Sequence, residues 1–247
     1  MKQSIIPCLD IKQGRVVKGK KFKNVQDVAD PVTLAKQYEK DQADMLFLLD
    51  ITGNDRAAFL QIIQQIQEKT KLPLYIGGGI RSLQAIRETL EAGADKVSIT
   101  SAAITQPGFL QEAVETFGGD RIILSIDAKE VAEDTWHAFI SGGKQDANID
   151  AIEWAKQGET IGVSGLLLNS IDTDGVKSGY NIPLHQAVRK KVNIPIIASG
   201  GAGTINDFQK VLTDGEADAA LAASVFHYGD ILISDIKQAL TRESKDI

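Results

Sequence analysis

The stretch PLYIGGGIRSLQAIRETLEAGADKVSITS, residues 73–101, contains a complete strand–helix–strand unit. Its first apolar strand ends in three glycines, and a polar cap precedes an amphipathic helix. Gly93 ends that helix, and a second strand at residues 96–99 leads into Thr100 and Ser101. An apolar strand, a capped helix and a second apolar strand in this order are typical of parallel β-sheets with helical crossovers.

The same pattern returns in PIIASGGAGTINDFQKVLTDGEADAALAAS, residues 195–224. Gly79 aligns with Gly201 and, after one inserted residue, Ser101 aligns with Ser224. Glycines let the backbone approach a ligand closely, and the start of the helix that follows attracts an anion. The two copies therefore predict two phosphate sites, or one long substrate with a phosphate at each end. The alternative is that the glycines only close tight turns.

Composition narrows the class of protein. The chain has 247 residues, a length typical of one α/β barrel. Its net charge of −6 gives no support for binding to nucleic acids or anionic membranes. The lone Cys8 excludes an internal disulfide and a multi-cysteine metal site, and the three histidines show no spacing of metal ligands. We find neither a secretory segment nor an apolar run of transmembrane length, and therefore expect the cytoplasm.

Strand-then-helix units follow one another eight times along the chain. Strict alternation predicts a parallel sheet with right-handed crossovers, and eight units predict a closed (β/α)8 TIM barrel of the α/β class. We expect a single domain over residues 1–247, because no linker-like composition interrupts the pattern. Outside the barrel, we expect a long basic loop at residues 18–30 and a hairpin around residues 136–143.

The two halves of the chain also resemble each other at their first strands. IIPCLDIK at residues 5–12 aligns with IILSIDAK at residues 122–129, so that Asp10 corresponds to Asp127. Two homologous half-barrels would place these aspartates across the mouth of the barrel, where active sites of this fold lie. Facing carboxylates are the minimum set for acid–base catalysis, if their environments separate their pKa values. The alternative is that each aspartate caps a helix or pairs with a lysine.

Several motifs carry a family resemblance over nearly the whole chain. In order they are IIPCLDIKQGRVVKG, LLDIT, IGGGIRS, ADKVSITSAA, SIDAK, SIDTDGVKSGY, IASGGAG and ALAASVFHYGD. Together they resemble the cyclase subunit of imidazole glycerol phosphate synthase in histidine biosynthesis. The sister family, the phosphoribosylformimino isomerase of the same pathway, shares the half-barrel repeat and both aspartates. PCLDIK and ALAASVFH are more similar to the cyclase.

This resemblance implies a lyase reaction. Ammonia and a phosphoribulosyl-formimino aminoimidazole carboxamide ribonucleotide, which carries a phosphate at each end, would give imidazole glycerol phosphate and aminoimidazole carboxamide ribonucleotide. By similarity, Asp10 and Asp127 are the catalytic pair, and no cofactor or metal is implied. The implied phosphate and substrate contacts are Lys18, Asp50, Gly79, Thr100, Ser101, Ser141, Asp174, Gly175, Gly201, Ala223 and Ser224.

The resemblance also implies a partner. A glutaminase subunit would form a heterodimer with this chain by docking at the opposite, N-terminal face of the barrel, where it would contact Asp95 and Lys96 and supply ammonia. The family commonly has an ionic cluster at the ammonia entrance, and here Lys96 remains while three other places carry uncharged residues. Those residues are Ser4, Met45 and Gly165. The family also usually has asparagine where Thr100 stands, and threonine where Asn169 stands.

Two other functions remain open from the sequence. One is isomerisation of the earlier sugar–nucleotide intermediate, which needs no ammonia. The other is a non-catalytic barrel that only binds sugar phosphates, against which the acid–base pair argues.

Overall fold

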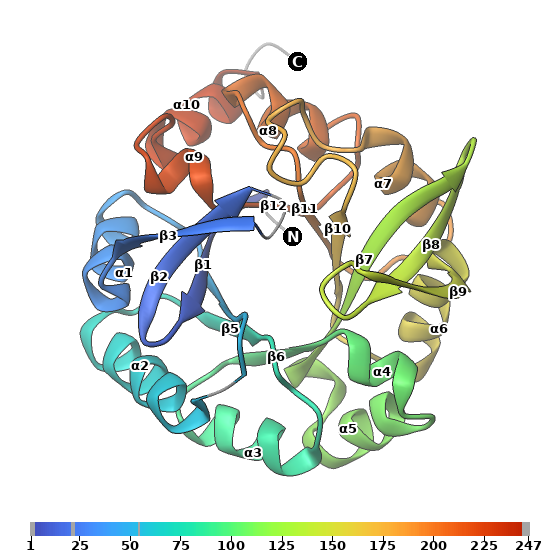
Figure 1. Ribbon diagram of the computed structural model, residues 1–247. Coiled ribbons are helices and arrows are strands. Elements are labelled where there is room, and N and C mark those ends of the chain that lie inside the picture. Colours follow the sequence, from blue (N-terminus) through green and yellow to red (C-terminus); the bar gives the residue numbers. More distant parts are fainter. Residues whose placement is uncertain (1–2, 21–22, 54, 244–247) are drawn as a thin grey trace.

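The structure is a computed structural model that describes residues 3–20, 23–53 and 55–243. Eight parallel strands close into a ring that helices surround, as Figure 1 shows along the barrel axis. In ring order these strands are β1 (Ser4–Lys12), β4 (Leu46–Asp50), β5 (Leu74–Gly77), β6 (Lys96–Ile99), β7 (Ile122–Ala132), β10 (Leu166–Ser170), β11 (Ile196–Ser199) and β12 (Ala219–Ala222). The predicted (β/α)8 barrel is confirmed.

Most helices cover the outside of the ring, and their ends follow local sequence signals. Asp30 caps the first helix, where its carboxylate accepts a hydrogen bond from the Thr33 N–H at 2.8 Å. Ser82 does the same for the helix of the first glycine unit. The helices are α1 (Pro31–Lys40), α2 (Arg56–Lys69), α3 (Leu83–Glu91), α4 (Ser101–Thr105), α5 (Phe109–Phe117), α6 (Ala151–Ile161), α7 (Ile182–Arg189), α8 (Ile205–Leu212), α9 (Ser224–His227) and α10 (Ile233–Glu243).

Two layers of apolar side chains hold the barrel together. Leu46, Phe47 and Leu48 are consecutive in β4, and all three are fully buried. Leu46 and Leu48 pack outward in the cluster shared with the helices, whereas Phe47 packs in the cluster inside the barrel. Successive strand residues point to opposite faces, so a strand buried on both faces must be apolar throughout.

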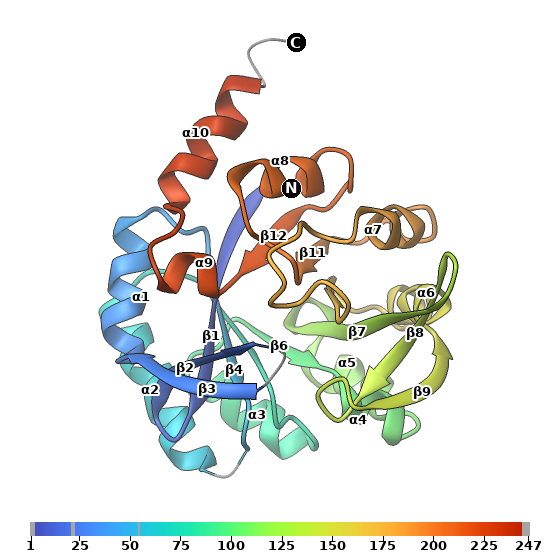
Figure 2. The same ribbon diagram turned by 45° about the horizontal axis from the view of Figure 1, so that its top comes forward.

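Two antiparallel hairpins extend the strands at the C-terminal end of the barrel. They are β2 (Arg15–Lys20) with β3 (Lys23–Ala29), and β8 (Thr135–Ile140) with β9 (Gln145–Asp150), and they lie on opposite sides of the ring (Figures 1 and 2). The second hairpin was predicted, but the long basic loop expected over residues 18–30 was wrong. The charged side chains of this segment gave no strand-like apolar pattern in the sequence. The two strands pair nevertheless, because the hydrogen bonds between strands join backbone groups.

Carboxylates at the opposite end of the barrel tie neighbouring strands together. Asp44 accepts a hydrogen bond from the Ile5 N–H, Asp95 from the Leu74 N–H and Asp218 from the Ile196 N–H, each at 2.8 Å. A fourth equivalent turn uses Ser164, whose hydroxyl donates to the Ile122 carbonyl. Because the four turns precede every second barrel strand, they reveal a quarter-barrel periodicity within the halves.

Two helices begin just after other elements. The short helix α4 ends at Thr105, and α5 follows from Phe109. Residues 149 and 150 complete β9, and Asp150 then caps α6, which begins at Ala151. Among the described residues, none of the helices combines the length and apolar character that crossing a bilayer requires.

Candidate active site

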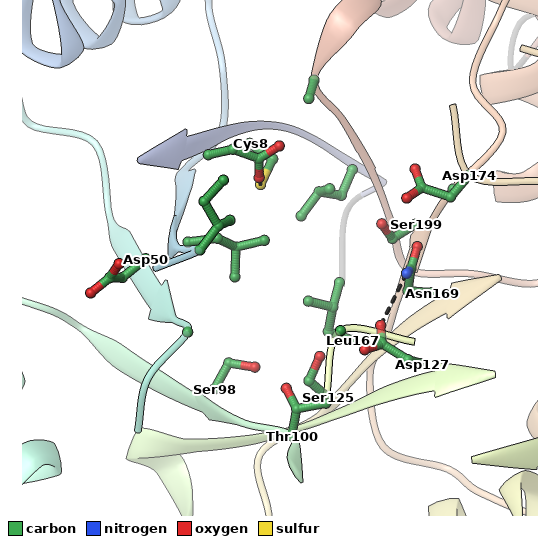
Figure 3. Close-up of a pocket in the computed structure, with 18 of the residues that line it drawn as sticks. Cys8, Asp50, Ser98, Thr100, Ser125, Asp127, Leu167, Asn169, Asp174 and Ser199 are labelled. Carbon is green, nitrogen blue, oxygen red and sulfur yellow. Dashed lines mark hydrogen bonds between the residues drawn. The ribbon is translucent and has the colours of Figure 1, made fainter. Parts of the chain in front are cut away.

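A cavity of about 680 Å³ opens at the C-terminal ends of the barrel strands. Every one of the eight strands, or the turn directly after it, contributes to the wall of this cavity, part of which Figure 3 shows. The predicted site residues that line it are Asp10, Asp50, Gly79, Thr100, Ser101, Asp127, Ser141, Asp174, Gly175, Gly201, Ala223 and Ser224. Lys18 was predicted in a loop, but its backbone lies in β2, and its side chain lies outside the described part of the structure.

Asp127 lies on β7, and its carboxylate points into the cavity beside Asn169 of β10 (Figure 3). The Asn169 amide donates a hydrogen bond to Asp127 Oδ1 at 3.0 Å, and the two residues are direct partners across the strand pair. Burial raises the pKa of Asp127 to about 6; the Asn169 hydrogen bond opposes this shift, and the negative charge of Asp174 adds to it. This carboxyl group can therefore hold or release a proton near neutral pH.

Asp10 lines the same cavity from the opposite wall. It lies on β1, which is four strands from β7 in either direction around the ring of eight. Cys8, two residues earlier on the same strand, faces the cavity too, with its Sγ 3.9 Å from Asp10 Oδ1. The structure thus brings the two aspartates to the walls of one cavity, as the half-barrel alignment predicted.

The first glycine turn, after β5, leaves no room for a side chain at Gly78. Gly78 and Gly79 have φ angles of +83° and +67°, in the left-handed region. A Cβ on Gly78 would lie 2.1 Å from the Asp50 carbonyl oxygen, so only glycine fits there. Asp50 Oδ1 in turn accepts hydrogen bonds from the Thr52 and Gly53 N–H groups at 3.0 and 2.8 Å. We call this turn, together with Thr100 and Ser101, the first cradle.

The second glycine turn, after β11, is equally close-packed. Gly200 and Gly201 have φ angles of +86° and +115°, and a Cβ on Gly201 would lie 2.0 Å from the Gly179 carbonyl oxygen. The Gly179 N–H donates back to the Gly201 carbonyl at 2.9 Å. This turn and Ser224, which opens α9, form the second cradle. The paired glycines of both cradles line the cavity.

Asp95 and Lys96 lie at the other end of the barrel from the cavity. The Asp95 carboxylate accepts a hydrogen bond from the Leu74 N–H at the start of β5, so it links two neighbouring barrel strands. Lys96 is half-buried, and its ammonium lies 5.7 Å from the centre of the Tyr75 ring. Burial lowers the pKa of Lys96, and the carboxylates of Asp120 and Asp95 oppose this shift.

The other residues expected around Lys96 are uncharged parts of the barrel floor. Ser4 and Gly165 are buried, and Met45 packs against the apolar cluster inside the barrel. That cluster, which includes Phe47 and Leu221, separates the cavity from the N-terminal face.

The three histidines have separate surroundings. The His137 ring lies 3.0 Å from the Asp146 carboxylate on the outer hairpin, and His227 Nδ1 lies 2.6 Å from the buried Tyr38 hydroxyl. His185 is fully buried in α7, where burial lowers its pKa to about 3. None of the three lines the cavity.

Comparison with known protein families shows the family to which this chain belongs. The family model described as "Histidine biosynthesis protein" matches residues 4–232. The chain belongs to this histidine biosynthesis family. Two similar proteins are named imidazole glycerol phosphate synthase subunit HisF. The one from Oceanobacillus iheyensis is 52% identical over 97% of this chain and 94% of its own. The one from a Hydrogenobaculum species is 50% identical over 96% of this chain and 94% of its own.

Within the histidine biosynthesis family, these relatives identify the activity. Identity of about half over nearly the full length of both chains supports the cyclase function in histidine biosynthesis, and the isomerase alternative is not favoured. The chain is an enzyme of this type. The curated relatives are named as subunits, which implies a partner in their enzymes.

Proposed function

We propose that the cavity of this cyclase converts the bisphosphate substrate and ammonia into imidazole glycerol phosphate and aminoimidazole carboxamide ribonucleotide, with Asp10 and Asp127 as its acid–base pair. The observation that carries the proposal is the raised pKa of Asp127, about 6, in a cavity that Asp10 lines from the opposite strand. We treat residues 1–247 as one domain, because all eight strands close a single ring.

Asp127 is the better candidate for the general acid. A group that delivers a proton must carry one at the working pH, and burial favours the protonated carboxyl. A bound bisphosphate would bring further negative charge into the cavity and raise this pKa again. Asp10 would then be the base that removes a proton as the imidazole ring closes. Asn169 holds the Asp127 side chain in position through its hydrogen bond.

The two cradles would bind the two phosphates of the substrate. Left-handed glycines allow backbone N–H groups to face an anion, and Ser101 and Ser224 would add hydroxyl donors. The cradles follow β5 and β11, which are four strands apart around the ring. A substrate that reaches from one cradle to the other must therefore cross the region between Asp10 and Asp127. Asp50, Asp174, Gly175 and Ala223 would shape the walls around the bound phosphates.

We also propose that a glutaminase subunit docks at the N-terminal face. The subunit names of the relatives and the half-exposed Lys96 support this. Asp95 is occupied by its hydrogen bond to β5, so Lys96 is the better candidate for the contact. Met45 and Gly165 carry no charge, so ammonia would enter past neutral side chains.

Turnover by the purified chain tests the proposal. The bisphosphate substrate is incubated with ammonium salt at high pH, where free ammonia is abundant, and loss of substrate absorbance is followed. Loss that requires ammonia and forms both products would support the cyclase. Conversion of the unisomerised precursor without ammonia would show an isomerase instead, and absence of any turnover would leave a binding barrel.

A further inference from the structure

The two cradles differ in charge although their backbones match. In the alignment of the two copies, Arg81 corresponds to Gly203, two residues after the paired glycines. Arg81 lines the cavity beside the first cradle. A Cβ on Gly203 would lie 2.4 Å from the carbonyl oxygen of Lys177, so the second cradle has no space for a side chain at this place.

A second cation, Lys144, lines the cavity from the β8–β9 turn. Ser141, Gly142 and Gly143 have consecutive φ angles of +59°, +67° and +73°. This left-handed run directs the Ser141 N–H to Ser101 Oγ at 3.1 Å, which attaches the turn to the first cradle. Lys144 completes the turn and lines the cavity. A serine with positive φ is unfavourable unless such a contact holds it.

The charges of these two residues are available for a ligand. Among the side chains that the structure describes, neither Arg81 nor Lys144 has an ion-pair partner. Lys177, the cation beside the second cradle, lies 2.6 Å from the Asp230 carboxylate, which neutralises it. Lys12 lines the cavity from the end of β1, and β1 lies between the two cradles in ring order, so it does not distinguish them.

We propose that Arg81 and Lys144 bind the phosphate in the first cradle and thereby decide which end of the substrate enters it. This inference rests on the proposed function, because it assumes a substrate with two phosphates. A barrel made of two similar halves offers such a substrate two opposite orientations, and only one of them places the reacting atoms correctly between Asp10 and Asp127. Guanidinium and ammonium groups form strong hydrogen bonds to phosphate, so two extra cations at one end favour one orientation.

Binding of the two products tests this inference, because each product carries one of the two phosphates. Calorimetry would measure Kd for imidazole glycerol phosphate and for aminoimidazole carboxamide ribonucleotide separately, with Arg81→Ala, Lys144→Ala and the double variant. We expect each single change to raise the Kd of one product, the same for both variants, about tenfold, and to raise the Kd of the other product less than about threefold. Arg81→Lys should recover part of the loss, and the weakening should shrink at high salt.

Matched controls separate local from general effects. Arg87→Ala removes a cation of α3 that packs over the Phe117 ring outside the cavity, and Lys177→Ala removes the neutralised cation of the second half. Both should leave the two Kd values within about threefold. Equal weakening of both products by Arg81→Ala and Lys144→Ala, or no weakening of either, would overturn the inference.

Ser101→Asp distinguishes this inference from the proposed function. If Ser101→Asp weakens one product while the Arg81 and Lys144 variants weaken neither, the first cradle binds phosphate without these cations, and only the inference fails. If Ser101→Asp also changes nothing, the assignment of the first cradle as a phosphate site fails with it.

Discussion

Replacing Asp127 by asparagine should make the protein inactive and, at neutral pH, more stable. The amide keeps the shape of the side chain, and its oxygen can still accept the hydrogen bond from Asn169. It removes the proton-carrying group, so kcat should fall at least about a hundredfold. It also removes a carboxylate whose charged form is destabilised by burial in the cavity wall, as the rise of its pKa from 3.8 to about 6 indicates.

The pKa shift gives the size and sign of the stability change. A pKa raised in the folded state means that folding favours the protonated form of Asp127. The contribution of this group to the free energy of unfolding is therefore fully present below about pH 4 and is lost as the pH rises through 6. About two pH units at about 1.4 kcal/mol each set an upper value of about 3 kcal/mol. Because solvent in the cavity reaches part of the Asp127 side chain, we expect the pH-dependent stability difference between Asp127→Asn and wild type to be about 1–3 kcal/mol.

Urea unfolding of wild type and Asp127→Asn at several values between pH 4 and pH 7.5 measures this difference. The variant should gain stability relative to wild type as the pH rises, and other titrating groups cancel in the comparison. Asp134→Asn, in the exposed β7–β8 turn, is the control and should show no such trend. A pH-independent difference, or a variant that loses stability towards neutral pH, would refute the argument from burial. Near-normal turnover would remove Asp127 from catalysis.

Three further outcomes are expected. Ser101→Asp and Ser224→Asp each place a carboxylate against a phosphate, so KM should rise tenfold or more while circular dichroism stays unchanged; unchanged KM in both would reduce the cradles to structural turns. Lys96→Ala should lower glutamine-dependent activity with the partner present and leave ammonium-dependent activity nearly intact, whereas equal loss with both would indicate a role in barrel stability. Burial lowers the pKa of His185 to about 3, so wild type should lose stability as the pH falls below 6.5, by up to about 1.4 kcal/mol per pH unit. His185→Leu should flatten that slope in urea unfolding, and an unchanged slope would contradict it.

Much of the site could be predicted because its residues follow strand ends. Asp10 and Asp127 occupy equivalent places in repeated strands, and all parallel strands of a closed barrel end at the same face. Glycine turns were equally visible, since a backbone with positive φ and a close neighbour excludes other residues, as at Gly78 and Gly201.

Other features had weak or misleading signals. The β2–β3 hairpin lies in a lysine-rich segment, and this composition led us to expect a loop there. Asn169 was noted only as a place where the family usually has threonine, since its role depends on the pairing register that sets it directly beside Asp127. The contact of Ser141 with Ser101 joins residues 40 positions apart and has no local signature at all.

The sequence by itself determined the order of the eight barrel strands, the two-fold repeat and the end of the barrel at which the aspartates and glycines lie. These follow from short-range rules, because burial on both faces demands apolar strands and left-handed turns demand glycine. Only the tertiary structure decided the strand register, the raised pKa of Asp127 and the placement of Arg81 and Lys144 in the wall of one cavity. Those properties depend on which distant groups share one cavity: burial and neighbouring charge act through space, whatever the separation along the chain.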